Sequence, residues 1–85
     1  MRVIQVSESV LISGGTSVVK GYAFKAASDS EINFRNGDSA SADPQIPVLL
    51  GTDQSVRDYF EEGVPFKDGL YIEVSGDVEG SVWVA

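Results

Sequence analysis

Very few side chains in this sequence could take part in covalent chemistry. A serine or threonine nucleophile needs a neighbouring base, and the commonest base is missing because the chain contains no histidine. There is no cysteine either, which excludes a thiol nucleophile and a thiolate metal site. No lysine or carboxylate stands at a recognisable spacing from a serine or threonine. We therefore predict that the protein has no catalytic residues and is not an enzyme.

Acidic and amide residues occur in pairs that could serve acid–base or calcium chemistry. The pairs are Glu61 with Glu62, Asp77 with Glu79, and Asn36 with Asp38. Two carboxylates act together in glycosidases only across a cleft, and a chain of 85 residues leaves little room for one. Calcium accepts oxygen ligands, but the spacing matches no EF-hand loop. We interpret these residues as solvated turns and predict neither a metal site nor a cofactor.

Aromatic residues on strand faces are the stronger functional signal. Every second residue of the segment 70–75 is apolar, which places Tyr71 on the opposite face. Trp83 likewise lies opposite two valines. Tyr and Trp are enriched at protein interfaces, although half-burial between strands and stacking on a sugar are alternatives. The candidate contact residues are Val19, Tyr22, Tyr59, Phe66, Tyr71 and Trp83.

The formal charge of −7 is concentrated in one half of the chain. Residues 1–42 carry four acidic and four basic residues, whereas residues 43–85 carry nine acidic and two basic ones. A nucleic-acid-binding face requires the opposite sign, so we predict no binding to nucleic acid or to an anionic membrane. The acidic turns either keep a small β-protein soluble or form a solvent face opposite a docked neutral half.

The length predicts one small domain spanning residues 1–85. Domains of this size are often reinforced by disulfides, metals or oligomerisation, and only oligomerisation is left here. We therefore predict a homo-oligomer, with a trimer favoured. The N-terminus does not resemble a signal peptide, and no apolar stretch approaches the roughly 20 residues of a membrane helix. Synthesis in the cytoplasm of the cell that makes the protein is expected.

The chain reads as seven or eight short strands separated by turn signals about every ten residues. Residues 52–62 fit a short helix or a strand, and the β-rich surroundings favour the strand. Asn36-Gly37 is the strongest short hairpin signal, and the segments 70–75 and 81–84 are predicted to pair as a C-terminal hairpin. Gly21, inside the long strand 16–27, suggests a bulge or close packing. The predicted fold is all-β: a single antiparallel β-sandwich, or jelly-roll-like domain.

The C-terminal third resembles the end of small virion structural proteins of tailed bacteriophages. The similar segments are Arg-Asp-Tyr-Phe at 57–60, the Gly-plus-apolar step at 63–66, Gly-Leu-Tyr-Ile at 69–72 and Gly-Ser-Val-Trp at 80–83. A looser similarity covers Lys-Ala-Ala-Ser at 25–28 and Ile-Asn-Phe-Arg-Asn-Gly at 32–37. Together these segments extend the resemblance over about three-quarters of the chain.

The resemblance implies a β-sandwich that assembles on the particle as a capsid decoration or cement protein. Its expected partners are other virion proteins, above all the major capsid protein, and its expected location is the virion. The family offers no catalytic residues to carry over. Two alternatives stay open: a small carbohydrate-binding or adhesion module on the particle surface, and a tail or baseplate adaptor.

Overall fold

The computed structural model describes residues 1–85 and contains eight strands and no helix. The strands are β1 (Arg2–Val6), β2 (Val10–Ser13), β3 (Ser17–Ala26), β4 (Ser30–Asn36), β5 (Asp43–Leu50), β6 (Ser55–Phe66), β7 (Leu70–Ser75) and β8 (Val78–Val84). All paired strands are antiparallel. The predicted all-β fold with a small β-sandwich is therefore confirmed.

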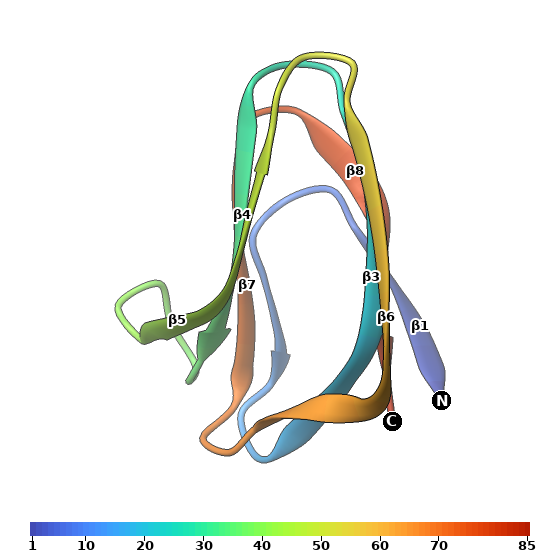
Figure 1. The fold of residues 1–85 in the computed structure, drawn as a ribbon. Coiled ribbons are helices and arrows are strands. Elements are labelled where there is room, and N and C mark those ends of the chain that lie inside the picture. The colour runs from blue at the N-terminus through green and yellow to red at the C-terminus, as the bar shows by residue number, and fades with distance from the viewer.

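The strands form two four-stranded sheets that face each other as two layers (Figure 1). Sheet A has the order β1-β8-β3-β6, and sheet B has the order β2-β7-β4-β5. The chain changes sheet at almost every link, and β4 and β5 are the only consecutive strands that pair. Asn36 is the last residue of β4, and Gly37 is the first residue of the hairpin loop. The loop runs from Gly37 to Ala42 and is therefore longer than a two-residue turn.

The predicted C-terminal hairpin is wrong, because β7 belongs to sheet B and β8 to sheet A. Gly76, with a φ of 101°, turns the chain from one layer to the other. The next residue is bonded to the neighbouring corner of the sandwich: the Asp77 amide donates to Ser28 Oγ, and the Ala27 amide donates to the Asp77 carbonyl. The two strands thus bury their apolar sides against each other across the core.

Residues 52–62 form a strand rather than a helix, as the sequence favoured, with β6 beginning at Ser55. The same strand continues through Pro65 to Phe66. Its pairing with β3 is interrupted, because Val19 faces Val64 whereas Gly21 faces Tyr59. The interruption is a bulge on which Gly63 adopts a φ of 80°.

The core lies between the sheets and is built from the inward residues of both. Its fifteen members are Val6, Val19, Tyr22, Phe24, Ala26, Ile32, Phe34, Val48, Leu50, Phe66, Leu70, Ile72, Val78, Val82 and Val84. Phe34 lies at the centre, with ring centroids 5.3 Å from Tyr22, 6.2 Å from Phe24 and 6.4 Å from Phe66. These separations are typical of favourable aromatic pairs.

Candidate interaction surface

The structure separates the six candidate contact residues into three groups. Val19 and Phe66 are fully buried and Tyr22 is 5 % exposed, so these three residues belong to the core. The expectation that these three residues contact a partner is therefore wrong for the folded chain. Tyr71 lies on the outer face of sheet B, whereas Tyr59 and Trp83 lie on the outer face of sheet A.

Val19 reaches the core because strict alternation fails along β3. Strict alternation along the strand would place Val19 and Tyr22 on different faces of the sheet. The register shifts between Val19 and Gly21, so Lys20 is an extra residue relative to β8. This bulge turns Val19 to the same side as Tyr22.

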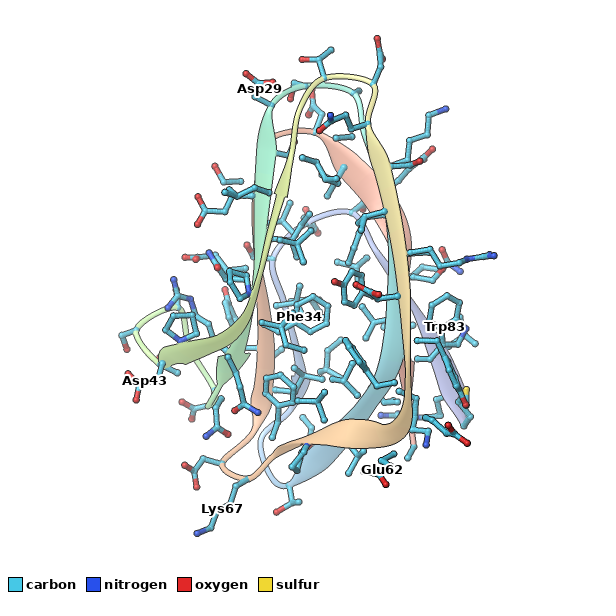
Figure 2. The ribbon with its side chains drawn as sticks, viewed as in Figure 1. Asp29, Phe34, Asp43, Glu62, Lys67 and Trp83 are labelled. Atoms are coloured by element: carbon cyan, nitrogen blue, oxygen red, sulfur yellow. The ribbon has the colours of Figure 1, made fainter.

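A row of residues crosses the outer face of sheet A from edge to edge. In the strand register Val3 faces Trp83, Trp83 faces Gly21, and Gly21 faces Tyr59. Tyr59 is 62 % exposed and Val3 is 55 % exposed, and Met1 next to them is 70 % exposed. We call Met1, Val3, Gly21, Tyr59 and Trp83 the aromatic platform. Figure 2 shows Trp83 pointing away from the space between the sheets.

Gly21 allows the platform to be flat. A Cβ atom at this position would lie 2.6 Å from the Asp58 carbonyl oxygen and 3.0 Å from Cε3 of Trp83. The indole therefore lies over the glycine backbone, at a place where any larger residue would displace it. Beside it is an apolar hollow of about 280 Å³, lined by Met1, Arg57, Asp58, Tyr59 and Trp83.

A more polar groove continues from the platform along the same face. In the register Gln5 faces Ser81, Ser81 faces Ala23, and Ala23 faces Arg57. The groove has a volume of about 520 Å³, and Lys25, Glu79 and Ser55 line its far end. Its floor is made of small residues, and its hydrogen-bonding and charged groups stand along the rim. The outer face of sheet A thus combines an apolar end with a polar end.

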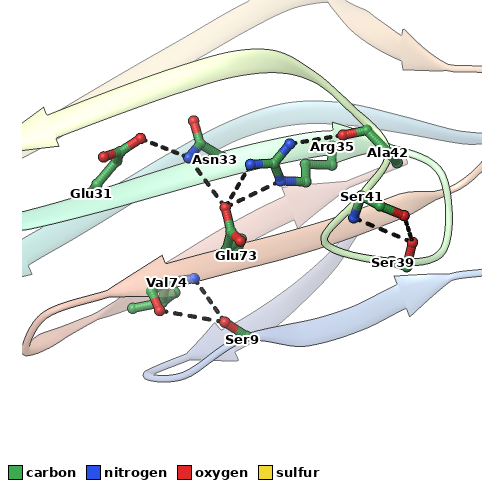
Figure 3. A network of polar contacts seen from close by, with 9 residues as sticks. All are labelled: Ser9, Glu31, Asn33, Arg35, Ser39, Ser41, Ala42, Glu73 and Val74. Atoms are coloured by element: carbon green, nitrogen blue, oxygen red, sulfur yellow. Dashed lines mark hydrogen bonds and ion pairs between the residues drawn. The ribbon is translucent and has the colours of Figure 1, made fainter.

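The outer face of sheet B has a different chemistry, dominated by a polar network (Figure 3). Arg35 donates through Nε and Nη2 to Oε1 of Glu73 at 3.1 and 2.7 Å, and through Nη1 to the Ala42 carbonyl at 2.7 Å. Asn33 donates to Glu31 at 2.9 Å and to Glu73 at 3.4 Å. Tyr71 is half-buried and faces Arg35 and Leu11 in the register. Its side chain therefore borders this network.

The hydrogen bonds from Arg35, its charge and the Asn33 amide together lower the pKa of Glu73, against a smaller effect of burial in the other direction. A carboxyl with a lowered folded-state pKa stabilises the fold above its ordinary pKa and loses that contribution as pH falls through the folded value. We expect Glu73→Gln to lower the free energy of unfolding at pH 7 by about 1 to 2 kcal/mol. Denaturant unfolding at neutral and acidic pH measures this. The difference in the free energy of unfolding between the wild-type and variant proteins should become smaller in acid. A difference that becomes larger would contradict the lowered pKa of Glu73.

Tyr22 and Asp58 form the one polar contact that reaches from the core to the open edge of sheet A. Asp58 faces Tyr22 in the register, and the Tyr22 hydroxyl donates to Oδ2 of Asp58 at 3.0 Å. Burial, this hydrogen bond and the charge of Asp58 raise the pKa of Tyr22 to about 12. At neutral pH the phenol is therefore a hydrogen-bond donor and not a base.

Sequence reasoning located Tyr59 and Trp83 but missed the residues around them. Val3 was a detectable member, because it alternates with Ile4 and Val6, the apolar inward residues of its strand. Arg57 had no signal of its own, since its place beside Ala23 depends on the register of β6. No group of histidine, cysteine, aspartate or glutamate side chains is arranged to hold a metal ion. The structure also has no helix long and apolar enough to cross a membrane.

Comparison with known proteins adds no relative from which a function could be transferred. No family model matches the chain, and no match was found among curated proteins or solved structures. Function is therefore inferred from the two faces of the sandwich and from the resemblance of the C-terminal segments.

Proposed function

We propose that this protein is a non-enzymatic structural protein of a tailed-phage virion, a capsid decoration or cement protein that binds the shell through its aromatic platform. The observation that carries the docking proposal is the gathering of Met1, Val3, Tyr59 and Trp83 on one sheet face. The resemblance of residues 57–83 to small virion proteins supports the choice of a phage particle as the partner.

The platform has the composition of an interface centre. Trp and Tyr dominate the binding energy of protein interfaces when a partner excludes water from them. Burial of apolar surface contributes roughly 25 cal/mol per Å², from which the costs of association are subtracted. Many copies on a symmetric shell would add avidity, so a modest platform suffices for retention on the particle. The polar network of sheet B would then face solvent.

The first test is the composition of purified particles. Mass spectrometry of density-purified phage whose genome encodes this chain should find it in a fixed ratio to the major shell protein. Particles stripped of it should take it up again from solution, and immunogold labelling should decorate the head. Its absence from purified particles would overturn the proposal. Labelling confined to the tail would replace the capsid assignment with the adaptor alternative.

Trp83→Ala should weaken rebinding to stripped particles on the order of 30-fold, because loss of an interface tryptophan typically costs 2 kcal/mol or more. Tyr71→Ala is the matched control, since it removes an aromatic side chain from the outer face of the other sheet. The quantity to measure is the rebinding isotherm, alongside the thermal midpoint of each free variant. If Trp83→Ala reduces the stability of the free domain by as much as it reduces binding, the role assigned to Trp83 fails.

A second candidate function, carbohydrate binding, is favoured by one observation. The platform continues into a groove with a small-residue floor and hydrogen-bonding side chains, among them Gln5, Arg57 and Ser81. Pockets that bind small molecules have this mixture of apolar walls and a few placed polar groups. A glycan-array signal that disappears in both Trp83→Ala and Arg57→Ala, without any binding to particles, would favour this function over the first.

A further inference from the structure

The four edges of the two sheets differ in how they are protected against pairing with another strand. Exposed edges are normally blunted by prolines, bulges, inward-pointing charges or extreme shortness. β6, one edge of sheet A, carries the bulge at Gly63, Pro65 near its end, and Asp58 on its inward side. It therefore combines three of these devices.

Both edges of sheet B are protected as well. β5 contains Pro44 and Pro47 and has a register shift opposite Phe34 and Arg35. β2 is only four residues long and has a register shift between Leu11 and Ser13. Neither edge offers a regular row of backbone groups to an incoming strand.

β1, the other edge of sheet A, has no proline and no bulge, and the only charge on its inward side is that of Arg2, at the end of the strand. Its five residues pair with β8 in an unbroken register from Arg2 to Val6. The sequence Arg-Val-Ile-Gln-Val has no proline or glycine and a single charge, at one end. Such a segment has a strong tendency to pair with other strands when left exposed. Val3, which belongs to the aromatic platform, is exposed on this edge.

We propose that β1 pairs antiparallel with β1 of a second copy, joining two sheets A into one eight-stranded sheet. This inference goes beyond the proposed function and does not depend on it. An antiparallel pairing centred on Ile4 places Arg2 opposite Val6 of the partner copy and Val3 opposite Gln5. The two arginines are then at opposite ends of the pair, so no like charges face each other. The contact is self-complementary, as two-fold symmetry requires.

Charge also favours this edge for contact between copies of a chain with a net charge of −7. The one charged residue of β1 is basic, whereas β6 carries Asp58, Glu61 and Glu62 and β5 carries Asp43. Pairing through β1 therefore brings the copies together where acidic repulsion is weakest. The two-fold axis runs perpendicular to the sheet, so both aromatic platforms face the same side.

The pairing is small for an interface. Five residues of strand extend only about 17 Å, so the buried area falls well below the roughly 1,600 Å² of a standard stable complex. We expect a dissociation constant on the order of 10 to 1,000 µM. The mass of the purified chain measured by sedimentation velocity should rise from 9.1 kDa towards twice that value as concentration increases.

Gln5→Lys tests the edge, because lysine on an edge strand opposes pairing. We expect it to raise the dissociation constant at least tenfold. Ser55→Lys is the control: it makes the same change of charge at an exposed residue of the opposite edge of sheet A, and should leave the constant unchanged. Both variants reduce the net negative charge, so a loss of dimer in Gln5→Lys alone cannot come from overall repulsion. Circular dichroism checks that both fold.

Cysteine pairs test the register, and the chain has no cysteine of its own. Residues directly opposite in an antiparallel pair have Cα atoms about 4.5 to 5.5 Å apart, within the range of a disulfide, whereas diagonal neighbours are about 7 to 8 Å apart. An oxidised mixture of Val3→Cys and Gln5→Cys chains should therefore yield the mixed dimer in preference to either homodimer. A monomer at every concentration, a closed trimer, or a dimer insensitive to Gln5→Lys would each overturn the pairing.

Discussion

Phe34→Ala is expected to lower the free energy of unfolding by about 3 to 5 kcal/mol, because the removed ring is fully buried and leaves a cavity. The ring projects from sheet B and packs against aromatic residues of sheet A, so collapse around the alanine would require both layers to move. A domain of this size has a total stability of about 4 to 13 kcal/mol. Chemical denaturation should therefore show a variant that has lost a large part of its stability.

Phe60→Ala is the matched control for this prediction. Phe60 lies on β6, is only half-buried, and has its ring 6.1 Å from that of Tyr22. The same chemical change should cost roughly half as much there, since part of the ring is already in contact with water. A larger loss for Phe60→Ala than for Phe34→Ala would contradict the position of the core.

The wild-type protein is expected to lose about 2 kcal/mol of stability between pH 10 and pH 12 through the titration of Tyr22. The pKa of this phenol rises to about 12 in the folded chain from 10.0. In this window the unfolded chain releases the proton while the folded chain retains it, so stability falls as pH rises. Below the unfolded value the contribution is fully present.

Tyr22→Phe isolates this effect, because lysines also titrate in alkaline solution in every variant. At pH 8 the variant should be less stable than the wild type by about 0.5 to 1.5 kcal/mol, because it lacks the hydrogen bond to Asp58. The difference should vanish or reverse near pH 12. Tyr59→Phe, which removes an exposed hydroxyl, should follow the wild-type curve. Parallel curves for the wild type and Tyr22→Phe would refute the assigned titration.

The sequence predicted the fold class and the strand positions well, but not how the strands are distributed between the sheets. Alternation along 70–75 correctly identified Leu70 and Ile72 as inward residues. It could not tell whether β8 continues the same sheet or crosses to the other, because inward residues look the same in both cases. The backbone conformation of Gly76 and the bonds of Asp77 decide this, and both depend on contacts distant in sequence.

The candidate site was predictable only where strands are regular. Trp83 lies on the outer face as alternation required, whereas the bulge beside Lys20 placed Val19 in the core. Phe66 lies at the end of a strand that a second bulge interrupts, and it too is buried. The platform depends on cross-strand neighbours, which the register of sheet A brings together. The virion location, the capsid partner and the trimer remain predictions.

Trp83 also gives the protein an intrinsic optical probe, because it is the sole tryptophan in the chain and lies half-exposed over Gly21. Its fluorescence therefore reports on one place, the aromatic platform, without an added dye. Coverage of the platform should shift the emission to the blue and shield the indole from iodide quenching. Unfolding should shift it to the red and increase quenching. The opposite directions separate docking from denaturation in a single titration.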